Sequence, residues 1–350
     1  MKKRVLSGIR ATGRLHLGNY LGAVKGMLEL QDNPEYETLY CVVDLHATTT
    51  PYDPKTLPQN TRSVILDYLA CGINPAKSTL YIQSDLADLI AQLSFYFSTV
   101  ETVARMQHLP TFKEKVKQHP QNVTMALLNY PILMAADILI YKAGLVPVGI
   151  DQEPHLEIAR EIARKMNEIY GTDFPEPVRF ATKGQYVPGL TGEGKMSKTV
   201  EGSSIFLTDT LDQIRNKVAK IPTDSGGGPG ANIKEFGNES DPKKIENFKK
   251  THTTVQKGVY ALFDLVGLFQ GDTLMLKYQQ DYVTKGVRYS EIKSNLSEAI
   301  YKELQPIQER RKYFEKNPKE VDKIIKEGGQ KARKIAEETV KEVKEKMGFF

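Results

Sequence analysis

Short strand-like runs alternate with longer helical patterns through the first half of this 350-residue chain. The strand-like runs cover residues 4–9, 38–43, 78–83 and 145–149, each bounded by Gly, Asp, Pro or Ser. Helical spacing of apolar residues covers 17–30, 61–71, 86–97, 103–116, 123–141 and 152–170. Strands that alternate with helices form parallel sheets through right-handed crossovers. The alternation therefore predicts an α/β fold with a doubly wound parallel sheet.

The second half of the chain has a different pattern. Gly-rich stretches at 189–194 and 224–230 indicate a mobile loop and a linker-like segment. Beyond about residue 240 the pattern is mostly helical, and it ends in a Lys/Glu-rich amphipathic helix. We therefore expect a Rossmann-like domain over residues 1–200 and a mostly helical region over 201–350. The terminal helix of that region could pack back on the first domain.

Composition places the chain among globular proteins that do not enter membranes. Hydrophobic residues make up 40% and charged residues 26% of the sequence, and no apolar run is long enough to cross a bilayer. The N-terminal segment has no hydrophobic region of signal-peptide length, and Cys41 and Cys71 fit two reduced, buried thiols. We expect a cytoplasmic protein. Its net charge of +5 permits nucleic-acid binding without indicating it.

A polar segment follows the first predicted strand, where the chain crosses a turn and enters a helix near His16. The free N–H groups and positive dipole end of a helix start favour phosphate. His16 and Asn19 are three residues apart and share one side of the first turn. Gly18 between them lets a ligand approach the backbone. The alternative is an ordinary polar helix start, which this motif alone does not exclude.

Two lysines form a second motif inside the Gly-rich loop, where Lys195 and Lys198 flank Met196 and Ser197. The chain has neither a Gly-x-Gly-x-x-Gly after its first strand nor a P-loop. Two ammonium groups three residues apart on a loop can close over a triphosphate. The alternative is a solvated cluster of charges. Together, however, the two motifs resemble, in order and α/β context, the two signatures of class I aminoacyl-tRNA synthetases.

A third motif lies on the helix predicted over 123–141. Tyr130, Met134 and Asp137 stand at i, i+4 and i+7, so they share one face. Asp137 is surrounded in sequence by apolar residues, where a carboxylate is costly unless it finds a donor. That donor could be an arginine elsewhere in the fold. In the functional interpretation, Met134 is a polarizable wall for an aromatic ring and Asp137 accepts a hydrogen bond from an indole N–H.

The sequence around this helix closely resembles bacterial tryptophanyl-tRNA synthetases. The segment Tyr-Pro-x-Leu-Met-Ala-Ala-Asp-Ile-Leu at 130–139 is the most discriminating match. Further matching segments are 7–9, 18–23, 44–48, 112–115, 145–152, 155–157 and 306–310. The matches span most of the chain.

The resemblance implies roles for the residues at the family's functional positions, and the helix start itself assigns His16 to the phosphates. The tryptophan-binding residues would be Asp137 at the indole N–H, Tyr130 and Gln152 at the amino group, His46 near the indole, and Met134. The ATP-binding residues would be Arg10, Ala11, Thr12, Gly18, Asn19, Gly149, Ile150, Asp151, Val187, Lys195, Met196, Ser197, Lys198 and Thr199. The catalytic residues would be His16, Asn19, Lys115, Lys195 and Lys198, all at the phosphates. Departures from the commonest bacterial pattern are Arg10 for Gln, His16 for Thr, Leu45 for Gln, Ile150 for Glu and Thr199 for Ser.

The implied activity is the ATP-dependent activation of L-tryptophan to tryptophanyl-adenylate, followed by transfer to tRNA(Trp). ATP would carry Mg²⁺ with it, since the sequence shows no all-protein metal cluster. The resemblance also implies a homodimer, a catalytic domain over 1–200 and tRNA binding by 201–350. The alternatives are a tyrosyl-tRNA synthetase, which usually has Gln where this chain has Met134, a synthetase-like module without aminoacylation, and a plain nucleotide-binding protein.

Overall fold

The computed structural model describes residues 2–149, 152–180, 186–198, 200–229, 231 and 253–349. The chain divides into two compact units, each assembled from segments far apart in sequence. The first unit comprises Met1–Gly13, Gly26–Thr182 and Tyr313–Phe350, and the second comprises Arg14–Lys25 and Lys183–Lys312. The functional division at residue 200, with catalysis before it and tRNA binding after it, stays a prediction.

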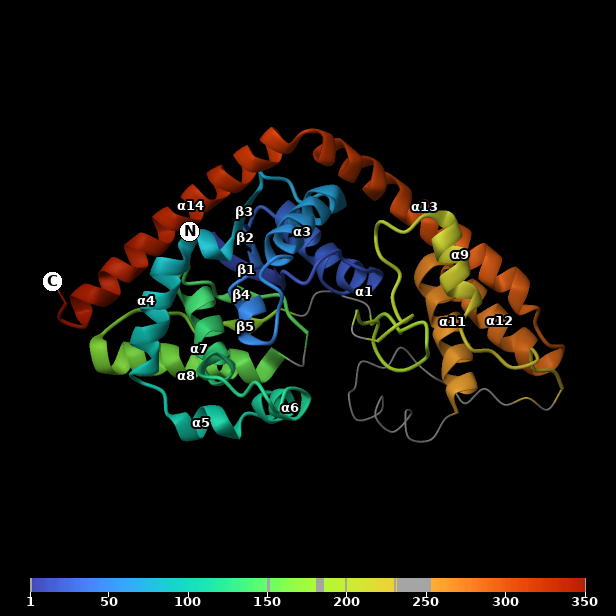
Figure 1. The fold of residues 1–350 in the computed structure, drawn as a ribbon, viewed down its shortest axis with the longest axis horizontal. Helices are drawn as coiled ribbons and strands as arrows, with labels where there is room; N and C mark the ends of the chain where they lie inside the picture. Colours follow the sequence, from blue (N-terminus) through green and yellow to red (C-terminus); the bar gives the residue numbers. More distant parts are fainter. Residues whose placement is uncertain are drawn as a thin grey trace. The chain divides into compact units, whose positions relative to one another are not determined.

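The first unit is built on a five-stranded parallel sheet (Figure 1). Its strands are β1 (Lys3–Arg10), β2 (Tyr36–Val43), β3 (Ser78–Ile82), β4 (Leu145–Val146) and β5 (Val178–Arg179). They lie in the order β3-β2-β1-β4-β5, so the chain builds outward from β1 first on one side and then on the other. This confirms the predicted doubly wound sheet, although β5 was not predicted. The point of reversal, between β1 and β4, is where such sheets bind ligands.

Helices cover both faces of this sheet because its residues alternate in direction (Figure 1). Leu39 and Cys41 of β2 belong to the core that α4, α7 and α8 complete. Tyr40 between them points the other way, and its hydroxyl donates to the backbone oxygen of Met27 in α2. The helices of the first unit include α2 (Lys25–Asp32), α3 (Leu57–Cys71), α4 (Ala87–Ser98), α5 (Val103–His108), α6 (Pro110–Gln118), α7 (Met125–Leu139) and α8 (Glu153–Tyr170).

Two predicted helices are interrupted in the structure. The pattern at 103–116 forms α5 and α6, because Pro110 lacks the N–H that would continue a helix and holds the preceding Leu109 extended. The pattern at 17–30 forms α1 (Leu17–Asn19), a π-helical turn over Tyr20–Val24, and α2. A π-helical turn widens a helix locally, which the apolar spacing does not encode.

The C-terminal helix α14 (Pro318–Lys346) packs against the edge strand β3 in the first unit (Figure 1). A Cβ atom added at Gly328 would lie 1.8 Å from the backbone oxygen of Leu80. The helix backbone therefore lies directly on the strand. Arg333 donates from the same helix to the carboxylate of Asp88 at 2.7 and 3.0 Å.

The second unit is mainly helical. Its elements include α1, α9 (Leu211–Ala219), α11 (Thr254–Gln270), α12 (Asp272–Thr284) and most of α13 (Tyr289–Lys316). The Gly-rich segment before residue 230 is fastened here, because Asp224 accepts hydrogen bonds from the hydroxyls of Tyr282 and Tyr289. Throughout the described ranges, every helix is too short or too polar to span a bilayer.

Candidate active site

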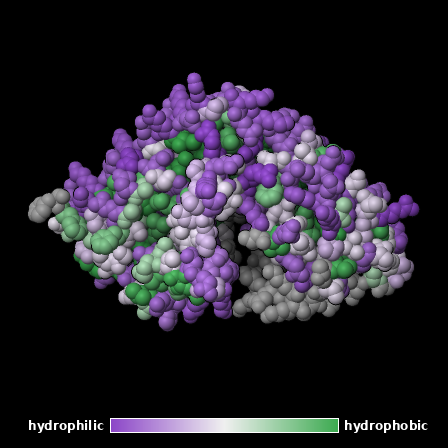
Figure 2. Space-filling view, viewed as in Figure 1, coloured by the Kyte–Doolittle hydropathy of each residue, from purple (hydrophilic) through white to green (hydrophobic). Residues whose placement is uncertain are grey.

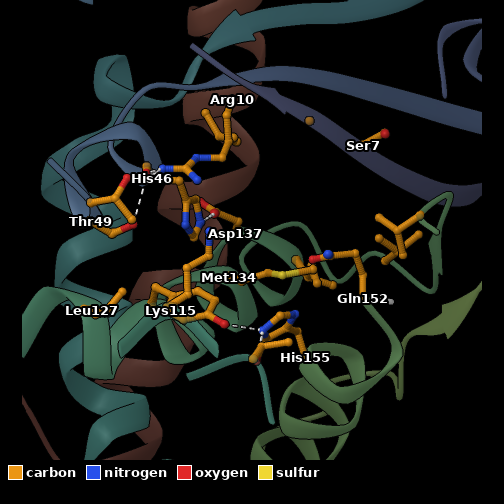
Figure 3. A pocket seen from close by; sticks show the side chains of 18 of the residues that line it. Ser7, Arg10, His46, Thr49, Lys115, Leu127, Met134, Asp137, Gln152 and His155 are labelled. Atoms are coloured by element: carbon orange, nitrogen blue, oxygen red, sulfur yellow. Dashed lines mark hydrogen bonds and ion pairs between the residues drawn. The ribbon is translucent and has the colours of Figure 1, made fainter. Parts of the chain in front are cut away.

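A cavity of about 530 Å³ opens at the carboxyl ends of β1, β2 and β4 in the first unit (Figure 3). Its volume is in the range of small-molecule sites, and its position is the reversal point of the sheet. The strands and the segments after them contribute Gly8, Arg10, Val43, Val146 and Val148. Helices α6, α7 and α8 supply most of the remaining wall.

The polar face of α7 forms one wall of the cavity. Tyr130, Met134 and Asp137 all line it, and the structure brings them together as their spacing predicts. Thr124 caps the helix by accepting a hydrogen bond from the N–H of Leu127 at 3.2 Å. Met134 points toward Gln152, the N-cap residue of α8 (Figure 3).

Asp137 is only 7% exposed and is held by two side chains from other segments. Gln83 donates to its two oxygens at 2.7 and 2.9 Å, and Nε2 of His46 lies 2.8 Å from Oδ2. Three hydrogen bonds offset the desolvation of the carboxylate, so an arginine partner is not needed. Sequence reasoning missed Gln83, which begins the 3₁₀ turn η3 (Gln83–Leu86) after β3.

Two cations line the same cavity. Nη2 of Arg10 donates to the backbone oxygen of His46 and to Oγ1 of Thr50, both at 3.0 Å. Burial lowers the pKa of Arg10, although a guanidinium stays protonated in proteins. Burial, followed by repulsion from Arg10, also lowers the pKa of Lys115 on α6. Both features favour an anionic ligand, which would relieve the repulsion.

A second polar group joins α6, α7 and α8. The hydroxyl of Tyr130 lies 2.7 Å from Nε2 of His155, and Oγ1 of Thr111 lies 3.0 Å from the same nitrogen. The rings of Tyr130 and His155 pack edge to face with centroids 5.1 Å apart. Sequence reasoning noted His155 within a matching segment but did not place it or Thr111 in the site. Its position one helical turn after Gln152 was the available signal.

The first signature motif lies in the second unit. His16 is the N-cap of α1 and is 6% exposed, and its backbone N–H donates to Oδ1 of Asn19 at 3.2 Å. Burial, followed by Lys198 and Lys195, lowers the pKa of His16 to about 4, so its imidazole is neutral at pH 7. A Cβ atom on Gly18 would lie 2.9 Å from Cε1 and Nδ1 of that ring. Any side chain with a Cβ atom at position 18 would therefore force the imidazole to shift.

The second signature motif lies in the same unit, on a loop held mainly by its backbone. Pro188 and Lys195 form an antiparallel bridge, and the N–H of Met196 donates to the oxygen of Val187 at 2.8 Å. Met196 is 2% exposed, whereas the side chain of Lys195 is exposed. The loop therefore buries its methionine and presents its first lysine to solvent.

The predicted site residues thus fall into two groups. The first unit holds Arg10, Ala11, Thr12, His46, Lys115, Tyr130, Met134, Asp137, Gly149 and Gln152, of which Ala11, Thr12 and Gly149 do not line the cavity. The second unit holds His16, Gly18, Asn19, Val187, Lys195, Met196, Ser197 and Lys198. The predicted ATP residues Ile150, Asp151 and Thr199 lie outside the described residues.

Comparison with known proteins identifies the family of the chain. The family of tRNA synthetases class I (W and Y) matches residues 1–305. A tryptophan–tRNA ligase of Porphyromonas gingivalis is 38% identical over 99% of this chain and 99% of its own length. Another from Helicobacter pylori is 40% identical over 100% of this chain and 99% of its own.

Solved structures agree with these sequences. A tryptophanyl-tRNA synthetase from Campylobacter jejuni, complexed with ADP and tryptophan, superposes with a TM-score of 0.81 at 30% identity, over 99% of this chain and 100% of its own. One from Mycoplasma pneumoniae superposes with a TM-score of 0.78 at 26% identity, over 100% of this chain and 99% of its own.

Proposed function

The chain belongs to the class I tRNA synthetases for tryptophan and tyrosine and ligates tryptophan to tRNA, and we propose that the cavity of its first unit is the tryptophan site. ATP and L-tryptophan give tryptophanyl-adenylate and pyrophosphate, and the tryptophan then passes to the 3′ end of tRNA(Trp). The site assignment rests on Asp137, whose buried carboxylate lines the cavity and is fixed there by hydrogen bonds to Gln83 and His46.

Asp137 matches what an indole ring needs. The indole N–H only donates, and an ionised carboxylate has about four acceptor positions. Gln83 and His46 use three of these, one on Oδ1 and two on Oδ2. The remaining position on Oδ1 receives the indole N–H, and Met134 packs on the ring. Tyr130, on the same wall of α7, and Gln152 bind the amino group of tryptophan.

Adenylate formation asks the protein for position and charge rather than for a base. The carboxylate of tryptophan is already ionised when it attacks the α-phosphorus, so the chain must orient the reactants and stabilise the phosphates. Neutral His16 and Asn19 hydrogen-bond the phosphates of ATP. Lys115, Lys195 and Lys198 supply positive charge to the departing pyrophosphate.

Magnesium belongs to the nucleotide in this proposal. In the described ranges, no three His, Cys, Asp or Glu side chains are grouped so as to hold a metal ion. Mg²⁺ keeps several waters and binds through substrate phosphates. When bound, it would be held by the phosphates of ATP and would supply neutralisation of their charge. We also propose that residues 201–350 bind tRNA. The enzyme works in the cytoplasm, where tRNA is charged.

We also propose that the enzyme is a homodimer. Residues 93–103 form an apolar stretch that is buried in part and exposed in part. Leu93 and Phe97 are fully buried, whereas Phe95 is 68% and Val103 58% exposed. Hydrophobic atoms gather on the visible face over α4, α5 and α8 (Figure 2). Exposed apolar groups of this kind mark association surfaces. Sedimentation of the wild type and of Phe95→Glu tests the proposal, which fails if both are monomers.

Tryptophan-dependent ATP–pyrophosphate exchange tests the proposed site, with tyrosine and phenylalanine in parallel. The chain contains no tryptophan, so indole fluorescence comes only from the ligand, and a change in its emission on binding reports the bound fraction. Exchange should require tryptophan, and Asp137→Ala should abolish both exchange and binding. Asp322→Ala, which removes an exposed acid of the first unit, is the matched control and should change neither. Exchange with tyrosine instead, or full tryptophan binding by Asp137→Ala, would overturn the assignment.

A further inference from the structure

Gln83 is fully buried, with 0% of its surface exposed, and does not line the cavity. Its Oε1 accepts hydrogen bonds from the backbone N–H groups of Leu45 at 3.0 Å and His46 at 3.3 Å. Backbone N–H groups can only donate, so they fix which end of the amide is oxygen. The NH₂ group of Gln83 must therefore face Asp137.

That orientation determines how Asp137 is presented. Nε2 of Gln83 donates to Oδ1 at 2.7 Å and to Oδ2 at 2.9 Å, so both carboxylate oxygens act as acceptors. An ionised carboxylate cannot donate, and Nε2 of His46, 2.8 Å from Oδ2, therefore carries the hydrogen. One side chain thus fixes the carboxylate, and through it the tautomer of His46.

The turn that begins with Gln83 is itself held by Asp44. Asp44 accepts from the backbone N–H of Ser84 at 2.9 Å and of Leu45 at 3.1 Å, and from the hydroxyl of Ser84 at 2.5 Å. These bonds join the turn that begins with Gln83 to the segment that supplies its two donors. The amide therefore has one orientation, set by hydrogen bonds at both its oxygen and its nitrogen.

We infer that Gln83 is a positioning residue that makes the cavity select ligands with a ring N–H. This rests on the proposed tryptophan site. With Asp137 fixed as an acceptor on both oxygens, a ring N–H completes the last position on Oδ1. A ring with sulfur in place of N–H leaves that buried position unpaired, which costs binding free energy. Gln83 never touches the ligand, so its effect must pass through Asp137.

The test compares tryptophan with β-(3-benzothienyl)alanine, in which sulfur replaces the indole N–H. The variants are Gln83→Met, which removes all amide hydrogen bonds, and Gln83→Glu, which keeps an acceptor for the two backbone N–H groups. Exchange assays give the KM for each amino acid and for ATP, and fluorescence gives the Kd for tryptophan. Gln92→Met, which removes a partly buried glutamine outside the cavity, is the matched control.

Both Gln83 variants should raise the KM for tryptophan about tenfold and lower the preference for tryptophan over the analogue about tenfold. The KM for ATP should not change, whereas a general loss of structure would alter both. If Gln83→Met does not fold, the preference measured for Gln83→Glu tests the inference. An unchanged preference in a folded Gln83 variant overturns the inference.

Asp137→Asn separates this inference from the proposed site. If Asp137→Asn abolishes the preference for tryptophan and the Gln83 variants do not, the site stands and only the role of Gln83 falls. If Asp137→Asn also leaves the preference unchanged, the tryptophan site itself is wrong.

Discussion

The cavity of the first unit and the His16–Lys198 group of the second hold their polar side chains in different ways. In the cavity, side chains hold one another: Asp137 is bound by Gln83 and His46. In the second unit, His16 is held by its packing against Gly18, and Lys195 is exposed on its loop. One region is organised by side-chain hydrogen bonds and the other by the backbone.

This difference predicts that variants of the two regions change different kinetic constants. A cavity whose donors and acceptors are already paired can recognise tryptophan in its ground state, so its variants should change KM. An exposed ammonium group acquires its partner when the phosphates are present, and charge develops on them as pyrophosphate leaves. A variant that removes such an exposed ammonium group, as at Lys195, should therefore change kcat.

Lys195→Ala should have the largest effect on catalysis. Loss of one charge-stabilising group typically lowers kcat on the order of a hundredfold, and adenylate formation should fall by that factor. Tryptophan binding, measured by fluorescence, should be unchanged because Lys195 does not line the cavity. Lys55→Ala, an exposed lysine of the first unit, is the control and should leave both quantities unchanged. Equal losses in binding and in catalysis would end the comparison between the two regions.

His16 should give the second unit a pH-dependent stability. Burial holds the pKa of His16 at about 4 in the folded chain, against about 6.5 when unfolded. Below pH 6.5 the imidazole of His16 is protonated in the unfolded chain but stays neutral in the folded chain. The free energy of unfolding is therefore highest above pH 6.5 and decreases as the pH falls to about 4. The contribution of His16 to this fall should be about 3 kcal/mol.

Urea unfolding at pH 7.5, 5.5 and 4.5 measures this contribution as the difference between the wild type and His16→Gln. The variant lacks the titrating ring, so its free energy of unfolding should depend less steeply on pH. Parallel pH profiles for the two proteins would show that His16 is solvated rather than held by burial, and would remove this contrast with the cavity.

The fold was predictable where the pattern is local and repeated. Alternation of strands and helices gave the doubly wound sheet, and helical spacing brought Tyr130, Met134 and Asp137 to one wall. β5 was not predictable because Val178–Arg179 is too short to show any period, and it is defined only by its pairing with β4. Pro110 was a readable signal for the break between α5 and α6.

The site was predictable only in part, because its hydrogen bonds connect distant segments. Gln83 meets His46 and Asp137, which lie 37 and 54 residues away along the chain. No spacing rule relates three segments that come together only after β2, β3 and α7 have packed. The resemblance to a known family predicted that the substrate is tryptophan. The chemistry of Asp137 alone predicted only that its carboxylate needs a hydrogen-bond donor.

The smallest expected effect concerns the attachment of the lysine loop in the second unit. The side chain of Lys257 on α11 is 9% exposed and pairs with Glu193 at 3.1 Å. A Cβ atom on Gly192 would lie 2.7 Å from the backbone of Lys257 and Gly258, so the loop packs tightly on this helix. Glu193 is 45% exposed, and pairs of that kind contribute about 0.2–1 kcal/mol.

Lys257→Met, which removes the buried charge itself, should therefore raise the KM for ATP about threefold and leave the KM for tryptophan unchanged. Glu193→Gln in the Lys257→Met background should add little, since the pair is already broken. Lys77→Met, which breaks an exposed pair with Asp32 in the first unit, should change neither KM. If Lys257→Met raises both KM values equally, the loop and the cavity are coupled. That outcome would break the contrast between a cavity organised by side chains and a loop held by backbone packing.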